Sequence, residues 1–404
     1  MAGSRLSRRD FLKVGGGGGS DSLGLFITGS DDARKSYFAD LTAAFQEESG
    51  RQFEPEYVGI EQSQQELTTR VGGGDPPATA YYPGRWLPDF ADLGALASVD
   101  SAAVEGFAAS AVEGGMVDGE LYGMPWGFST RALFYRTDLL ERAGLEPPRS
   151  WDEMLAAAQK MHDPDNDVYG FAIAGLDHTS TAVQFLIWLW SAGAEVLSED
   201  GTEALFNSDA GVEALTRYAS VVKDGYAEPG AITNDEPALH SLFRQGQLGM
   251  IITGPWMRAL METEESTVQM GQNAAVMPLP PWETRATLAT TDTLSIFTEG
   301  DPEAANEFLQ FAAQDALVFD YSIATQLQPV KESVTERPEF ADDPYWSEAF
   351  IPSGEFGRPY PNVVGWTDVE DALIAAVQQT LQDEDPKTAL DDAAEKANAA
   401  LDRA

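Results

Sequence analysis

Short apolar segments with strand character alternate with amphipathic helical segments along most of the chain. Residues 23–28 are apolar and end at Gly29-Ser30-Asp31, as a strand does when it runs into a polar loop. Apolar residues at helical spacing follow between Tyr37 and Phe45, and residues 53–60 alternate like a second strand. The order strand, helix, strand predicts a parallel sheet with crossover helices.

The same alternation continues through the rest of the 404 residues. Further strand candidates are residues 78–82, 132–135, 168–174, 248–253 and 273–277. Two capping boxes, Ser150–Glu153 and Thr367–Glu370, predict helix starts. A chain of this length predicts an α/β protein of two or more domains. Ligands of open α/β sheets lie at the carboxyl ends of strands. The candidate ligand-binding loops therefore begin at Gly29, Pro83, Pro125, Gly254 and near Thr291.

The charge balance is strongly acidic. There are 66 acidic and 25 basic residues, a formal net charge of −41, and only seven of the basic residues are lysine. Such a surface repels nucleic acid, because affinity for phosphates comes from Lys and Arg, and it should also repel anionic lipid. The plainer interpretation is a highly soluble surface. Because the acidity is dispersed and lysine is scarce, we favour adaptation to high salt, as in a halophilic archaeon.

Cysteine is absent, which excludes disulfides, thiol catalysis and Cys-ligated zinc. The three histidines, His162, His178 and His240, lie in no metal-ligand spacing and no catalytic motif, so we interpret them as surface or satisfied polar residues. We therefore expect no metal, no cofactor and no catalytic residue. The longest apolar stretch, residues 185–190, is far shorter than the roughly 18 residues of a membrane-spanning helix.

The N-terminus carries a basic motif in this acidic chain. Residues 7–13 read SRRDFLK and resemble the twin-arginine export signal, whose pattern is S-R-R-x-F-L-K. A run of glycines, Gly15 to Gly19, follows where an apolar region is usual. The alternative is a chance basic arm. We expect residues 1–22 to be a twin-arginine-type export signal region, and the protein to work at the outer face of the cytoplasmic membrane or extracellularly.

Four predicted loops combine a tryptophan with Gly or Pro and a polar neighbour. They are residues 83–86, 124–129, 253–256 and 362–368. A pyranose ring has apolar C–H faces that suit aromatic rings, and a rim of hydroxyls that suits carboxylates, Arg and amides. Ordinary packing is the alternative for any one tryptophan, and we expect it for Trp188 and Trp190 in an apolar helical run. The recurrence in loops favours a carbohydrate site.

Several motifs together resemble a known family. Residues 122–126, YGMPW, with 133–140, LFYRTDLL, look like the Y-G-x-P…L-x-Y-N-x-D-L-L signature of family 1 extracellular solute-binding proteins, with Arg136 in place of Asn. Residues 144–153 match A-G-x-x-x-P-x-T-W-D-E, and residues 243–256, FRQGQLGMIITGPW, match F-x-x-G-x-A-A-M-x-x-x-G-P-W. These proteins are the sugar-binding subunits of ABC importers, of the maltose-binding-protein type.

The resemblance implies a type II periplasmic-binding-protein fold, with two discontinuous α/β lobes joined by a hinge. By matching motifs, we expect one lobe at residues 23–129 plus 287–332 and the other at 130–286 plus 333–404. The implied function is capture of a mono- or oligosaccharide and its delivery to the membrane permease subunits of an ABC importer. We expect a monomer that is not an enzyme.

The resemblance and the strand-end loops also suggest ligand-binding residues. They are Ser30, Asp31, Arg85, Trp86, Trp126, Ser129, Trp256, Asp292 and Trp366. Trp256, the Trp of the G-P-W element, is expected to stack on sugar, and Asp292 either binds a hydroxyl or is a solvated turn carboxylate. We expect the three tryptophans 126, 256 and 366 on one lobe or at the hinge, facing Arg85, Trp86 and Asp292.

Two alternatives differ in function. The same fold could bind a non-sugar solute such as glycerol phosphate, a polyamine or a peptide. Arg85 and Arg131 permit a phosphate, although the aromatic residues favour sugar. A secreted glycoside hydrolase would use two carboxylates beside aromatic platforms, yet no spacing marks one pair among 66 acidic residues.

Overall fold

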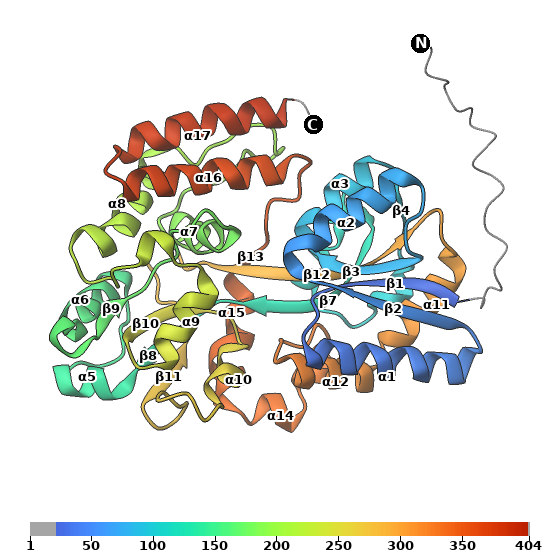
Figure 1. The fold of residues 1–404 in the computed structure, drawn as a ribbon, viewed down its shortest axis with the longest axis horizontal. Coiled ribbons are helices and arrows are strands. Elements are labelled where there is room, and N and C mark those ends of the chain that lie inside the picture. Colours follow the sequence, from blue (N-terminus) through green and yellow to red (C-terminus); the bar gives the residue numbers. More distant parts are fainter. Residues whose placement is uncertain (1–21, 403–404) are drawn as a thin grey trace, which may run out of the picture.

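In the computed structural model, residues 22–402 are described, and they form two α/β lobes joined by long strands (Figure 1). The two-lobed α/β architecture expected from the sequence is confirmed. The expected export signal lies outside the described residues, apart from Ser22, which begins the first strand. None of the described helices is both long enough and apolar enough to cross a membrane.

The first lobe, here the N-lobe, is built on a mixed sheet with strand order β13-β12-β3-β1-β2, in which β4 and β7 also pair with β12. Its strands are β1 (Ser22–Thr28), β2 (Gln52–Val58), β3 (Thr79–Pro83), β4 (Leu96–Ala97), β7 (Gly123–Thr130), β12 (Thr287–Phe297) and β13 (Gly357–Arg358), with a separate hairpin of β5 (Met116–Val117) and β6 (Glu120–Leu121). Its helices are α1 (Asp32–Ser49), α2 (Ile60–Gly73), α3 (Leu87–Asp92), α4 (Ala109–Glu113), α11 (Pro302–Ala312) and α12 (Asp315–Thr325).

Alternating residues of the N-lobe strands supply two separate cores. Leu25 and Ile27 of β1 pack in the cluster that contains Phe38 of α1, whereas Phe26 packs in the cluster that contains Phe90 of α3. Successive side chains of a strand point to opposite faces, so this pattern places helices on both faces of the sheet. Figure 1 shows α1 and α12 on one face and α2 and α3 on the other.

The second lobe, the C-lobe, contains a four-stranded sheet in the order β11-β8-β10-β9. Its strands are β8 (Ala132–Arg136), β9 (Tyr169–Phe171), β10 (Leu248–Thr253) and β11 (Ala274–Met277). Its helices are α5 (Thr137–Ala143), α6 (Trp151–Met161), α7 (Thr179–Ser191), α8 (Asp209–Lys223), α9 (Glu236–Arg244), α10 (Met257–Met261), α16 (Trp366–Leu381) and α17 (Pro386–Leu401). Strands β9 and β10 are parallel, and β8 is antiparallel to β10 and β11.

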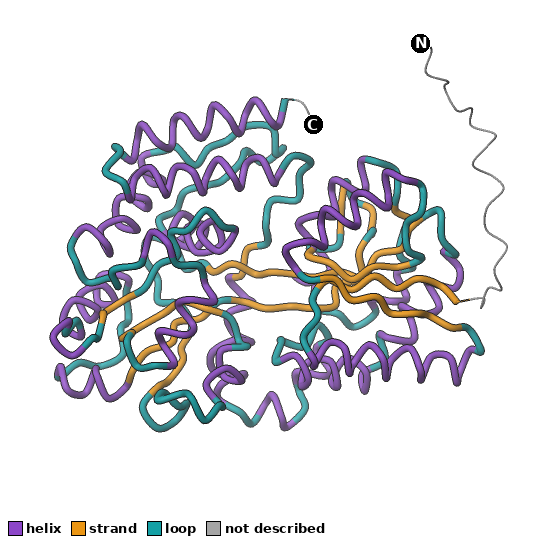
Figure 2. The backbone as a smooth tube through the Cα atoms, viewed as in Figure 1, coloured by secondary structure: helices purple, strands orange, loops and turns teal. Residues whose placement is uncertain are grey.

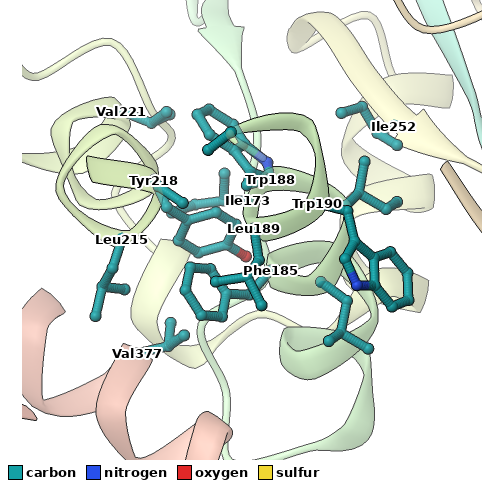
Figure 3. Packing of buried hydrophobic residues seen from close by; sticks show 14 of the residues in the cluster. Ile173, Phe185, Trp188, Leu189, Trp190, Leu215, Tyr218, Val221, Ile252 and Val377 are labelled. Atoms are coloured by element: carbon teal, nitrogen blue, oxygen red, sulfur yellow. The ribbon is translucent and has the colours of Figure 1, made fainter. Parts of the chain in front are cut away.

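Helix α7 is the centre of the C-lobe core (Figure 3). Trp188 lies 4.5 Å from Trp151 and 5.3 Å from Tyr218 in edge-on contacts between ring centroids. Trp190 is also buried, so both tryptophans of the apolar run have the packing role expected from the sequence. Helices α16 and α17 pack on this core from the far end of the chain, through residues such as Val377.

The chain passes between the lobes at three places, and the two long strands of the passage run through the centre of the molecule (Figure 2). Strand β7 ends at Thr130, and β8 begins in the other sheet at Ala132, so only Arg131 separates them. Strand β12 begins at Thr287 next to the C-lobe and ends inside the N-lobe sheet. Near the third passage, Gln328 forms a β-bridge with Phe128.

The segment after this third passage contacts both lobes. It contains α13 (Glu332–Thr335), α14 (Pro338–Ala341) and α15 (Ile351–Ser353). Phe340 lies 6.0 Å from Phe319 of the N-lobe helix α12, whereas Asp343 forms an ion pair with Arg258 of the C-lobe helix α10. The lobe limits expected from the sequence stay a proposal, and β13, which they assign to the C-lobe, pairs with β12 of the N-lobe sheet.

Candidate ligand-binding site

Strand ends from both lobes meet at a cavity of about 290 Å³ beside the hinge. From the N-lobe, the first turn of α1 and the short helical turn after β3 bring Arg34 and Arg85 to its wall, and β7 and β12 contribute Ser129 and Asp292. From the C-lobe come the starts of α7, α9 and α10, which follow β9 or flank β10. The carboxyl ends of parallel strands in both sheets therefore point toward the cavity, as expected for a ligand site of an α/β protein.

Trp256 is the principal aromatic side chain of the cavity wall. It lies directly before α10, at the end of the loop that follows β10, and it is half-buried. The guanidinium of Arg131 lies over its ring at 4.6 Å from the centroid, and the ring of His240 meets it edge-on at 6.4 Å. Gly254 is required here, because a Cβ at that position would come within 2.3 Å of the Trp256 ring.

A buried hydrogen-bond network lies next to Trp256. Thr253 donates to Glu236 at 2.6 Å, and His240 Nε2 lies 2.7 Å from the same hydroxyl. Burial alone would raise the pKa of Glu236, but the hydrogen bond from His240 and the charge of Arg131 outweigh it and lower the pKa to about 2. Glu236 is therefore an anion at neutral pH.

The N-lobe side of the cavity is also fixed by hydrogen bonds. Asp292 accepts a hydrogen bond from Tyr81 at 2.5 Å, and the Tyr321 hydroxyl lies 2.9 Å from that of Tyr81. Ser129 and Thr290, on adjacent strands, share a hydrogen bond of 2.7 Å. These contacts hold Asp292 and Ser129 in place before any ligand arrives.

The two lobes also touch each other across the cleft. Arg85 of the N-lobe lies 3.8 Å from Glu370 of α16, and the Gly365 N–H donates to Asp89 at 3.4 Å. Thr179 donates to Glu370 at 2.9 Å. Burial raises the pKa of Glu370, and Arg85 and Thr179 oppose that effect. The predicted capping box at Thr367–Glu370 is wrong, because the N-cap of α16 is Gly365, two residues before Thr367, and Glu370 pairs with Arg85 across the cleft instead.

The structure brings some of the predicted site residues together. Arg85, Ser129, Trp256 and Asp292 all line the cavity. Asp31 does not line it but accepts hydrogen bonds from the backbone and side chain of Arg34, which does. Ser30 is exposed in the same loop.

The other three predicted residues are buried in the cores. Trp126 packs 5.3 Å from Tyr321 and 6.2 Å from Tyr37, and only 2% of it is exposed. Trp86 is stacked on Tyr82, with ring centroids 6.1 Å apart. Trp366 is 1% exposed at the start of α16. The geometry gives these rings a packing role. Of the three tryptophans expected to face Arg85 and Asp292, only Trp256 lines the cavity with them.

Sequence reasoning missed several cavity residues. Arg34, Glu236 and Tyr360 were not singled out, and Arg131 was considered only as a phosphate partner. The sequence signal that could have identified Glu236 is its i, i+4 spacing from His240 on one helix face. Two polar residues that face an otherwise apolar core need polar partners, which indicates a buried polar site. His178 caps α7 and lines the cavity, and His240 is buried and hydrogen-bonded.

A second cavity, of about 620 Å³, lies on the opposite face of β12. Ala289 and Thr291 face it, whereas Thr290 and Asp292 face the first cavity, as alternating residues of a strand must. Arg358 and Glu195 form an ion pair in its wall, with nitrogen and oxygen 2.5 Å apart. The smaller cavity is the candidate ligand site, because there the segments that follow the parallel strands of both lobes converge on the ring of Trp256.

Two α/β lobes joined by three chain passages, with a cavity between them, are the architecture of the periplasmic-binding-protein type expected from the sequence. Residues 29–317, more than half of the chain, match the family described as Bacterial extracellular solute-binding protein. The chain belongs to this family.

Relatives and solved structures are similar over most of their length. A binding protein of Brucella abortus (strain 2308) is 30% identical over 375 residues, covering 90% of each chain. The galactooligosaccharide-binding protein of Bacillus subtilis (strain 168) is 25% identical over 301 residues, covering 71% of this chain and 68% of that one. The ABC transporter solute-binding protein of Thermotoga lettingae, bound with α-D-tagatose, aligns with a TM-score of 0.84 over 95% of this chain and all of that one, at 24% identity. The last similarity shows the fold.

Proposed function

We propose that the protein captures a carbohydrate outside the cell and delivers it to the permease subunits of an ABC importer. The observation that carries this proposal is the interlobe cavity, in which the half-buried ring of Trp256 stands beside charged groups from both lobes. An aromatic face suits the C–H face of a sugar, and Arg, Glu and Asp suit its hydroxyls. The sugars named for the relatives and solved neighbours support the same class of ligand.

The charges in the cavity favour a neutral ligand over glycerol phosphate. Each of its three arginines has a carboxylate partner: Arg34 has Asp31, Arg85 has Glu370, and Arg131 has Glu236. Asp292 adds a further carboxylate to the wall. An anion entering this cavity would compete with carboxylates that already face the guanidinium groups. A hydroxyl can instead accept a hydrogen bond from a guanidinium and donate one to a carboxylate.

The ionised state of Glu236 argues against hydrolysis as the function of this site. A glycoside hydrolase needs one carboxylic acid that stays protonated near neutral pH to protonate the leaving oxygen. Glu236, one of the two carboxylates in the wall, has a pKa lowered to about 2 and is ionised. It is therefore unsuited to the acid role. We also propose that the protein is exported by the twin-arginine-type route and that it acts as a monomer.

Thermal unfolding in molar KCl tests the ligand class. We expect maltose, tagatose, ribitol or a galactooligosaccharide to raise the melting temperature, since a ligand at 100 times its Kd stabilises by about 2.7 kcal/mol. Glycerol 3-phosphate at the same concentration should leave it unchanged. A shift with glycerol 3-phosphate and none with the neutral compounds would contradict the proposal. The buffer alone and potassium phosphate serve as controls.

A further inference from the structure

Arg131 occupies an unusual place, at the single residue between the last N-lobe strand of the first passage and the first C-lobe strand. Only 6% of it is exposed, and it lines the interlobe cavity. Its neighbours come from both lobes: Ser129 from β7, Glu236 from α9 and Trp256 before α10. The guanidinium is therefore a buried charge at the centre of the candidate site.

The hydrogen-bonding capacity of Arg131 is mostly unused by the described residues. A guanidinium has five N–H donors, and here one of them reaches Ser129 Oγ at 3.3 Å. Its Nε has no hydrogen-bond partner among residues 22–402. The nearest carboxylate oxygen, Glu236 Oε1, lies 3.9 Å from Nε, which is an ion-pair distance but too long for a hydrogen bond. A buried charge held in this way lacks partners that a ligand can supply.

In the ion pair of Arg131 and Glu236, the carboxylate of Glu236 is held in place by its neighbours. Thr253 donates to it at 2.6 Å, and His240 Nε2 lies 3.4 Å from the same oxygen, so the carboxylate cannot turn freely toward Arg131. It is 8% exposed and also lines the cavity. The guanidinium and the carboxylate both line the cavity and approach each other to 3.9 Å, so one oxygen atom in the cavity can lie within hydrogen-bonding distance of both groups.

We propose that Arg131 and Glu236 form a hydroxyl-binding pair, in which one sugar hydroxyl accepts from the guanidinium and donates to the carboxylate beside Trp256. A hydroxyl is the group that can do both, whereas a carboxylate or phosphate only accepts. At this position of the ligand the pair thus favours a hydroxyl over a carboxylate or phosphate group. This inference rests on the proposed carbohydrate function and names the residues that set its specificity.

Two variants test the pair. Glu236→Gln removes the acceptor charge and leaves Arg131 uncompensated, so affinity for a neutral sugar should fall about tenfold or more. The ratio of glucuronate and galacturonate binding to neutral-sugar binding should rise by about tenfold or more, because the free guanidinium now attracts a carboxylate. Arg131→Lys keeps the charge and stem but loses the planar donors, so it should weaken neutral-sugar binding without raising uronate binding.

A matched control is Asp343→Asn. Asp343 is also the carboxylate partner of an arginine, Arg258, whose guanidinium lies 4.0 Å from the centroid of the Tyr345 ring. These residues do not line the interlobe cavity. We expect wild-type sugar affinity and wild-type rejection of uronates from it.

Calorimetry with maltose, tagatose, ribitol, glucuronate and galacturonate in molar KCl measures all four proteins, and circular dichroism checks their fold. If wild type binds a neutral probe and both site variants keep its affinity and its rejection of uronates, the inference is overturned and the proposed function stands. If wild type binds none of the neutral probes, the proposed function fails, and the inference fails with it. If the Glu236→Gln variant does not fold, the affinity of Arg131→Lys for the neutral sugar tests the inference, and an unchanged affinity overturns it.

Discussion

Replacing Trp256 by alanine is expected to weaken sugar binding by at least about 2 kcal/mol, or about 30-fold, in a protein that still folds. Its ring is the main aromatic surface of the interlobe cavity, and its position is set by Arg131 at 4.6 Å and by the network around Glu236. The ring is only half-buried in the protein, so its loss should cost more in binding than in stability. Calorimetry with the neutral sugar that stabilises wild type measures the loss.

Trp282→Ala is the matched control for this variant. Trp282 is also half-buried and also carries an arginine, Arg217, at 4.3 Å from its ring, but it belongs to neither cavity wall. We expect it to bind sugar as wild type does. Equal affinities for wild type and a folded Trp256→Ala protein would remove Trp256 from the ligand site.

Dilute buffer is expected to lower the melting temperature sharply, on the order of 10 °C relative to molar KCl, which is roughly 8 kcal/mol for a chain of this size. A net charge of −41 repels itself across one compact body. The Debye length is about 30 Å at 0.01 M salt and about 3 Å at 1 M, so carboxylates on distant parts of a lobe repel each other only in the dilute buffer.

A melting series in KCl and NaCl measures this dependence, and a parallel series in sucrose separates screening from the general effect of an excluded solute. We expect the salts to stabilise steeply below molar concentration and sucrose to have a smaller, gradual effect. A melting temperature that does not change with salt would contradict the prediction of adaptation to high salt.

Much of the fold could be predicted, because the strand and helix periods in this sequence are clear. The strand expected at residues 248–253 is β10 as the structure has it, and the candidate at 273–277 is β11, from Ala274. The candidate at 168–174 shortens to β9, Tyr169–Phe171, because pairing with β10 ends at Phe171. Ser150 caps α6 as predicted, although Glu153 reaches back to the N–H of Arg149.

The site could be predicted only in part. The tryptophans at 86, 126 and 256 all lie within two residues of a Gly or Pro, and nothing local distinguishes a ring that faces the cleft from one that packs in a core. Trp86 is buried against Tyr82, four residues earlier, whereas Trp126 is buried against Tyr321, which is 195 positions away. The pairing of Arg85 with Glu370 joins residues 285 positions apart, so it depends on how the lobes meet and not on a local pattern.

Solution scattering with and without a saturating neutral sugar tests most directly the claim that the lobes close on their ligand. Closure needs the ligand to bind the closed form better than the open one, and contacts from both lobes to one cavity provide that difference. We predict a smaller radius of gyration for the sugar-bound protein, with the pair Arg85 and Glu370 formed across the cleft. Identical scattering curves, with binding confirmed by calorimetry in the same buffer, would contradict the account.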